Sequence, residues 1–253
     1  MVKRRAVSKA DKELQPDRLP MLYKTLVPLT AERQSGTYLS PERDYAFANM
    51  VNAIPVTTDE FAPAMRNYPI VLAGGDVPTP VALVGFETGR NDHVDADGHW
   101  AKGAYIPAYL RRYPFAYVRE SNTSDRNILC ADLSSVIFDT KGAPDRALFE
   151  EDGQPGTLLK NVMDFCNRYD IATQRTRLAM EEAIKFDLIE DSTVTVSRGE
   201  KTLKVDGFRV ISEEKLRALP DDVLAGLARR GVLNIYAAHH LSLTNFSSFG
   251  SAL

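Results

Sequence analysis

The residues of this chain most able to do chemistry lie between Asn91 and Phe115. This window holds the only Trp of the 253-residue sequence, two of its four His, and an adjacent arginine pair. Guanidinium groups offer a planar fork of donors to carboxylates or phosphates, and neighbouring aromatic rings can stack on them or on a sugar. We therefore predict a partner-binding segment. Its six residues are Trp100, Tyr105, Tyr109, Arg111, Arg112 and Tyr113.

An alternative for the same segment is structural. Aromatic side chains fill hydrophobic cores, and arginines form ion pairs with buried or surface carboxylates. On a helix, Tyr105, Tyr109 and Arg112 would share one face. Both interpretations stay open, because the sequence does not show which of these side chains reach solvent.

Two acidic residues in this window raise the hypothesis of a calcium site. A calcium-binding loop alternates oxygen ligands, has Gly at its sixth position and ends with a bidentate Glu at its twelfth. Counted from His93, the residues Asp95, Asp97 and Gly98 fit this pattern, but Ala104 occupies the twelfth position. The coordination shell cannot close, so a hairpin turn is the favoured interpretation.

His93 and Asp95 raise a second metal hypothesis. With His239 or His240 as a third ligand, they match the two-histidine, one-carboxylate pattern of non-haem iron oxygenases. A His-x-Asp pattern is common by chance, and we expect no metal and no cofactor in this chain.

A further polar cluster lies near the C-terminus, where His239 and His240 precede Ser242, Thr244 and Asn245. A serine nucleophile needs a histidine base and a third group that orients it. The chain has no Gly-x-Ser-x-Gly, Walker, Gly-x-Gly-x-x-Gly, His-Glu-x-x-His or Cys-x-x-Cys motif. We interpret the cluster as the polar end of a strand, and the catalytic residues, if any, stay unknown from the sequence.

Bulk composition narrows the classes of partner. The formal net charge is −3, from 31 basic and 34 acidic residues, which gives no electrostatic reason to expect nucleic acid. No stretch approaches 18 apolar residues, so we expect no membrane insertion. Cys130 and Cys166 are expected to be reduced core thiols, which favours the cytoplasm.

The hydrophobic patterns predict an α+β fold: a mostly antiparallel sheet in the N-terminal half, packed with a long helix and a C-terminal hairpin-plus-helices region. We expect a disordered tail at 1–18, one domain at 19–246 and a flexible tail at 247–253. That domain would comprise a β-rich part at 19–140, a long helix at 157–188, and a hairpin with short helices at 192–240.

Local signals place the elements of the β-rich part. Thr57 and Glu60 form a capping box that opens a short helix ending near Arg66. The expected strands are 21–29, ended by Pro28; 70–73 and 81–86, as antiparallel neighbours; a short strand before the Asp97-Gly98 turn; and 115–118 and 127–131, extending the same sheet. A short helix is expected at 105–113.

The C-terminal part has the strongest periodicity. From Leu158 an apolar stripe continues for about 30 residues, which predicts the long helix. Alternating Val and Leu residues flank a turn at 197–200 and predict a hairpin. Ser212 should cap one helix, Pro220 should open another that stops at Gly231, and 232–237 is expected to form a last strand.

Three stretches of the sequence resemble the bacterial SapC family, named after a protein linked to surface-layer formation. They are Met21-Leu22-Tyr23-Lys24, Asn67-Tyr68-Pro69-Ile70 and the window 91–115. The resemblance covers most of 21–245 and is strongest at 67–115, whereas the long basic N-terminal tail departs from it. It implies a role in surface-layer or outer-surface protein biogenesis and implies no reaction.

Two hypotheses of function follow. The preferred one is a non-catalytic cytoplasmic accessory protein that binds a protein, a peptide or an anionic glycan through the aromatic and arginine residues. The alternative is an enzyme, either an iron oxygenase or a modifier of surface polymers. Whether the chain forms a homodimer is left open.

Overall fold

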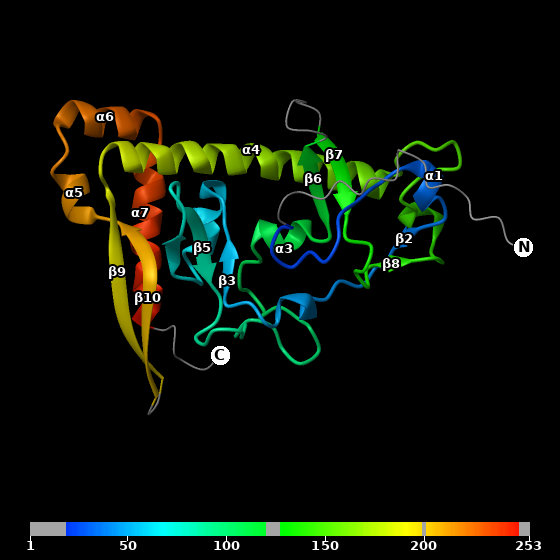
Figure 1. Ribbon diagram of the computed structural model, residues 1–253, viewed down its shortest axis with the longest axis horizontal. Helices are drawn as coiled ribbons and strands as arrows, with labels where there is room; N and C mark the ends of the chain where they lie inside the picture. Colours follow the sequence, from blue (N-terminus) through cyan, green and yellow to red (C-terminus); the bar gives the residue numbers. More distant parts are fainter. Residues whose placement is uncertain (1–18, 120–126, 199–200, 248–253) are drawn as a thin grey trace, which may run out of the picture. The chain divides into compact units, whose positions relative to one another are not determined.

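The computed structural model describes residues 19–119, 127–198 and 201–247 and confirms the predicted α+β class (Figure 1). The chain divides into two compact units, which we describe separately. The first comprises 19–43 and Arg112–Asn167, and the second comprises Asp44–Arg111 and 168–247. The single domain stays a prediction, and the predicted tails lie outside the described residues except for Ser247.

The first unit contains two small antiparallel sheets. Its elements are β1 (Val27–Pro28), α1 (Ala31–Gln34), β2 (Tyr38–Leu39), β6 (Phe115–Arg119), β7 (Asn127–Ala131), β8 (Phe138–Asp139), η4 (Pro144–Arg146) and the first part of the long helix α4 (Thr157–Lys185). One sheet has the order β1-β7-β6, and β2 pairs with β8. The prediction that 115–118 and 127–131 extend the sheet of 70–73 was therefore wrong. Residue alternation identifies a strand but not its partner.

The predicted strand at 21–29 was also mostly wrong. Leu22 has a φ of 78°, outside the range of extended backbone, and only β1 pairs with another strand. The Lys24 amide instead donates to the buried Asp132 carboxylate at 2.6 Å, and Thr25 Oγ1 donates to its other oxygen at 3.1 Å. Burial raises the pKa of Asp132, but hydrogen bonds from Ser134, Lys24 and Thr25 outweigh burial and hold this pKa below its usual value.

The core of the first unit holds both cysteines. Cys130 lies on β7 and Cys166 on α4, both buried and both free thiols, as the sequence predicts. Burial raises the pKa of Cys130 to about 11. Its thiol is therefore protonated and unreactive at neutral pH.

The second unit is built on a five-stranded antiparallel sheet of order β3-β5-β4-β10-β9. Its elements are η2 (Ala46–Ala48), β3 (Ala53–Pro55), η3 (Thr58–Glu60), α2 (Phe61–Ala64), β4 (Ile70–Ala73), β5 (Thr79–Leu83), α3 (Ala108–Arg112) except for its last residue, the rest of α4, β9 (Ile189–Arg198), β10 (Lys201–Ile211), α5 (Glu213–Arg217), α6 (Asp221–Arg229), α7 (Val232–Leu243) and η5 (Thr244–Ser247). The β4–β5 pair, the long helix and the β9–β10 hairpin were all predicted.

Two apolar clusters cover the two faces of this sheet. Alternate residues of β4 point to opposite sides, so Leu72 packs with Met180 of α4 and Tyr236 of α7. Its neighbour Val71 belongs to the second cluster, which includes Phe208. Both faces of β4 are therefore buried, which explains its uninterrupted apolar sequence.

The last predicted strand, at 232–237, is instead the start of helix α7. Gly231 adopts a φ of 74° before it, and buried side chains recur along the helix at Val232, Tyr236 and His239. This spacing of three to four residues is helical, although the first residues are apolar enough to suit a strand. The caps at Ser212 and Pro220 are confirmed.

Two smaller differences concern the window 91–115. The expected strand before the Asp97-Gly98 turn is a single bridge between Val94 and Trp100. The expected helix at 105–113 is the shorter α3. None of the described helices combines the length and the hydrophobicity needed to cross a bilayer.

Candidate functional site

The structure buries most of the predicted partner-binding residues. The exposed fractions are 9% for Trp100, 6% for Tyr109, 9% for Arg112 and 7% for Tyr113. Tyr105 and Arg111 are half-buried. Burial favours a packing role for the first four, and partner binding stays a prediction for which Tyr105 and Arg111 are the best placed.

Arg112 and Tyr113 belong to the first unit and pack against Tyr23. The Arg112 guanidinium lies 5.7 Å from the centroid of the Tyr23 ring, and the rings of Tyr23 and Tyr113 meet edge to face at 5.2 Å. The Tyr23 hydroxyl donates to the Phe115 carbonyl at 2.7 Å, and Arg43 Nη2 donates to the Tyr113 carbonyl at 2.7 Å. These contacts join the N-terminal segment to the start of β6.

Trp100 belongs to a buried aromatic cluster of the second unit. Its indole N–H donates to the hydroxyl of Tyr68 at 3.2 Å, and its ring stacks on His93 at 5.8 Å. Tyr68 is fully buried and donates to the Tyr105 carbonyl at 2.5 Å. Asn67 accepts from the Tyr105 amide at 3.0 Å. Tyr68 and Asn67 thus hold both ends of the segment that runs from Trp100 to Tyr105.

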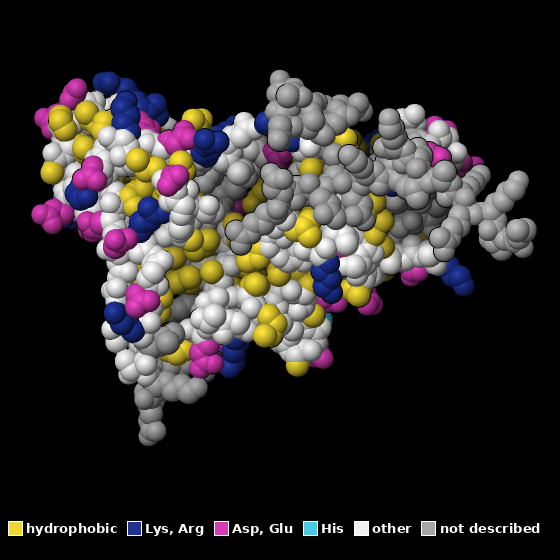
Figure 2. Space-filling model, in the orientation of Figure 1, with side chains coloured by type: hydrophobic (Ala, Val, Ile, Leu, Met, Phe, Trp, Pro, Cys, Tyr) yellow, Lys and Arg dark blue, Asp and Glu magenta, His cyan; other side chains and the backbone are white. Residues whose placement is uncertain are grey.

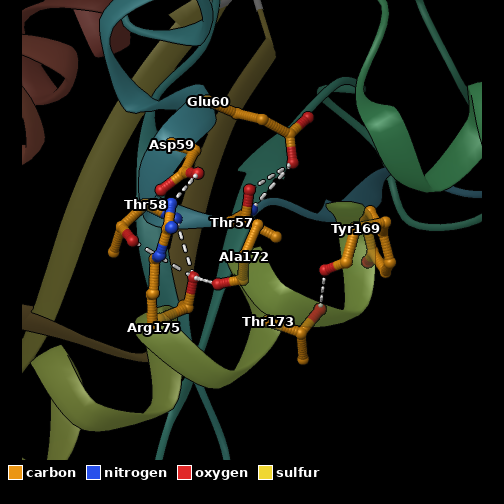
Figure 3. Close-up of polar contacts among 9 residues, drawn as sticks. Thr57, Thr58, Asp59, Glu60, Tyr169, Ala172, Thr173 and Arg175 are labelled. Atoms are coloured by element: carbon orange, nitrogen blue, oxygen red, sulfur yellow. Dashed lines mark hydrogen bonds and ion pairs between the residues drawn. The ribbon is translucent and has the colours of Figure 1, made fainter. Parts of the chain in front are cut away.

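A buried carboxylate organises the half-buried residues. Glu60, 5% exposed, accepts from the amide and the hydroxyl of Thr57 through Oε2, at 2.9 Å each, in the predicted capping box (Figure 3). Its Oε1 accepts from the Ala108 amide at 2.6 Å and from the Tyr105 hydroxyl at 3.1 Å. Glu60 therefore caps two helix starts, η3 locally and α3 at a distance.

Arg111 completes this network, which we call the Glu60 network and define as Glu60, Tyr105 and Arg111. Arg111 Nη2 donates to the Tyr105 hydroxyl at 2.9 Å, and Nε donates to the Ile106 carbonyl at 3.0 Å. Burial and then the charge of Glu60 raise the pKa of Tyr105 to about 12, against an opposing effect of Arg111. Tyr105 is therefore a neutral phenol at pH 7 that fixes the guanidinium in one orientation.

The capping segment is anchored to α4 by a second set of polar contacts. The Thr58 amide donates to the buried Thr176 hydroxyl at 2.8 Å, and Thr176 donates to the Ala172 carbonyl at 2.8 Å. Beside it, Arg175 lies 3.3 Å from the Asp59 carboxylate (Figure 3). The Glu60 network thus rests on the longest helix of the chain.

The proposed iron ligands are not gathered. Asp95 is exposed, and its carboxylate accepts from the amides of Asp97 and His99, within its own turn. His93 packs between the rings of Tyr68 and Trp100, and burial lowers its pKa. Among the described residues, the metal-ligating side chains that come together are Asp95, Asp97 and His99, all exposed. The turn needs these hydrogen bonds for its own geometry, in agreement with the hairpin interpretation.

The C-terminal histidines complete the sheet. The Ile211 amide donates to His239 Nε2 at 3.1 Å, and His240 Nε2 pairs with the Ile211 carbonyl at 2.8 Å. The Ser242 hydroxyl accepts from the Ile70 amide at 3.0 Å and donates to the His239 carbonyl. Ser242 therefore bonds to backbone and not to an imidazole, and no nucleophile–base pair forms here. These residues lie on a helix, which corrects the predicted strand end.

Each unit also has an open cavity. In the second unit a cavity of about 300 Å³ has an apolar floor that includes Val71 and Phe208, and a polar rim that includes Asn52 and Lys204. In the first unit one of about 720 Å³ lies beside Tyr38 and the acidic turn that follows Phe149. None of the six predicted residues lines either cavity.

Sequence reasoning missed Glu60 as the centre of the site. It identified the capping box, but the contact with Ala108 spans 48 residues, and no local pattern encodes it. The only signal in the sequence was Glu60 itself, a carboxylate directly before the apolar residues that start at Phe61.

Comparison with protein families gives one result. The family model described as SapC matches residues 29–249. Searches of curated proteins and of solved structures find no significant match.

Proposed function

The chain belongs to the SapC family, and from this premise we propose that it is a non-catalytic cytoplasmic accessory protein of surface-layer or outer-surface protein biogenesis. It binds a protein or peptide partner, or an anionic glycan, through Tyr105 and Arg111. This role does not require a catalytic group.

The supporting observation is the preset geometry of Arg111. Its Nε and Nη2 donors are held by the Ile106 carbonyl and the Tyr105 hydroxyl, and Tyr105 is in turn held by Glu60. A guanidinium that is already oriented loses less conformational freedom when it meets a carboxylate or sulfate. The half-buried phenol beside it adds an aromatic surface for a peptide or sugar.

Binding to defined fractions tests this function. Immobilised full-length chain is exposed separately to bacterial outer-surface proteins and to a purified anionic polysaccharide, and bound material is quantified. Arg111→Ala should reduce capture from one of the two fractions about tenfold or more, and Arg111→Lys should recover only part of it, because Lys lacks the planar fork.

The matched control is Arg177→Ala, which removes an exposed arginine of the same unit that pairs with Glu181. It should leave capture unchanged. Unchanged capture by a folded Arg111→Ala variant would refute the proposal. Arg112→Ala serves as a structural comparison, because its burial predicts a loss of stability.

A further inference from the structure

Strand β9 forms an edge of the five-stranded sheet. It runs for ten residues, from Ile189 to Arg198, and pairs with β10 along its inner side only. In the described part of the chain no strand pairs with its outer side. An edge of this length presents a row of backbone donors and acceptors that can template another strand.

The register shows which backbone groups point outward. The Ser212 amide donates to the Leu188 carbonyl, and Ile189 pairs with Ile211 beside it. The backbone N–H and C=O groups of successive residues point to opposite sides of a strand, so those of the even-numbered residues of β9 point toward β10. The backbone groups of the odd-numbered residues point outward, among them those of Asp191, Thr193, Thr195 and Ser197. The bulge between Val205 and Phe208 has its extra residue on β10, so this alternation is unbroken along β9.

The outer edge lacks the usual protection against pairing. From Ser192 to Ser197 the sequence contains only Ser, Thr and Val, without Pro, Lys or any other charge. Protected edges carry charges, prolines or bulges. In Figure 2 the charged side chains of this unit gather over α5 and α6, and fewer lie over the ribbon of β9 and β10.

We propose that two copies of this chain pair antiparallel through β9 around a two-fold axis at Val194. Thr193 of each copy then hydrogen-bonds Thr195 of the other, and Asp191 bonds Ser197. The outward groups supply about eight hydrogen bonds, two for each pair. This inference is independent of the role proposed for Arg111.

Charge and packing select this register over its neighbours. With Val194 on the axis, Glu190 and Asp191 of one copy lie opposite positions 198 and 197 of the other, so the acidic ends stay apart. Val194 packs against the apolar cluster that contains Val196 and Phe208. Two Val194 side chains facing each other join the clusters of both copies. A register centred on Thr193 would instead set Glu190 opposite Val196.

The occupant is a second copy because the edge complements itself. A two-fold antiparallel pair is isologous, so the β9 edges of both copies are paired with each other and the assembly closes at two chains. The stretch from Ser192 to Ser197 carries no charge, so it gives no electrostatic preference for a charged partner of another kind.

Cysteine cross-linking tests the register. In a non-hydrogen-bonded antiparallel pair the facing Cα atoms are about 4.5 Å apart, within disulfide range. Val194→Cys should therefore form a covalent dimer of twice the 28.1 kDa chain mass under mild oxidation. Thr193→Cys should not, because its symmetry mate lies diagonally, about 7–8 Å away. The native thiols are buried in the other unit and serve as the background in wild type.

Sedimentation velocity across a dilution series tests the surface without cross-linking. Thr195→Pro removes an outward amide, and at an edge this leaves the inner ladder intact. It should raise the dimer dissociation constant about tenfold or more, whereas Thr195→Val should not change it. A wild-type chain that stays monomeric throughout, with no Val194→Cys dimer, overturns the proposal. So does a wild-type dimer whose dissociation constant Thr195→Pro leaves unchanged, because it would use another surface.

Discussion

Removing the charge of Glu60 should destabilise the second unit strongly for a single-atom change. In wild type its two oxygens accept four hydrogen bonds, from Thr57 twice, from Tyr105 and from Ala108. Glu60→Gln keeps the shape but turns one oxygen into a donor. In either orientation of the Gln side chain, its NH2 group faces a backbone N–H donor, that of Thr57 or that of Ala108.

The magnitude follows from this conflict. A buried backbone amide without an acceptor costs about 1–3 kcal/mol, and hydrogen bonds to a charged acceptor are about twice as strong as neutral ones. We therefore expect a loss of about 2–4 kcal/mol in the free energy of unfolding of this unit. With a urea m-value of about 2 kcal/mol/M, the midpoint should fall by about 1–2 M.

Fluorescence of Trp100 is the appropriate assay. It is the only Trp of the chain, is buried, and lies in the same unit as Glu60. Tyr105→Phe removes one of the four bonds and should cost about 1 kcal/mol. Glu214→Gln, at an exposed position, should have no effect. If the Glu60→Gln midpoint matches wild type, the carboxylate does not organise this site and the reasoning fails.

Two further predictions concern helices α4 and α7. Thr176→Val should lower the free energy of unfolding by about 1–3 kcal/mol, because the buried Thr58 amide loses its acceptor. The same change at exposed Thr173 of the same helix should cost less than about 0.5 kcal/mol. Equal losses for the two variants in the urea midpoint of Trp100 fluorescence would contradict the prediction. Burial, reinforced by His240, lowers the pKa of His239 from 6.5 to about 3, so its contribution to stability is complete above pH 6.5 and declines as pH falls toward 3. His239→Gln keeps an acceptor for the Ile211 amide. When the pH falls from 7 to 5, the free energy of unfolding from urea titrations should drop by about 2 kcal/mol less for this variant than for wild type. Equal drops would show that this ring does not set the acid sensitivity.

The elements predicted correctly from sequence are those with local causes. The apolar stripe from Leu158 gives α4, the Thr57 capping box gives η3, and the Ser212 hydroxyl caps α5 by accepting from Lys215. Each signal operates within a few residues or repeats along one segment. Such signals are readable without knowledge of the fold.

The wrong predictions depended on tertiary contacts. In 21–29 the Lys24 amide donates to Asp132, more than 100 residues away, and not to a neighbouring strand, so the segment does not form a full strand. The run from Val232 has strand-like composition, but its polar residues His239 and Ser242 complete the backbone hydrogen bonds of two strands. Packing and hydrogen-bond satisfaction overrode local preference in both cases.

The six predicted partner-binding residues divide by burial, and their role in binding stays a prediction. Aromatic and arginine residues in the core give the same sequence pattern as those on a binding surface, because the sequence shows residue types and not the exposure of side chains. The structure separates them. Trp100 packs inward on Tyr68, while Tyr105 and Arg111 are held at half exposure by Glu60.

This separation affects where function should be sought. Two stretches that carry the family resemblance, 67–70 and 91–115, hold each other in place through Tyr68, Asn67 and Trp100. Residues with this role can identify a family because they define its fold, whatever its members bind. Substituting them should destabilise the fold, so a loss of partner capture by such variants would reveal nothing about recognition. Arg111 is the more informative target, because its change alters charge at a half-buried position while Glu60 still caps α3.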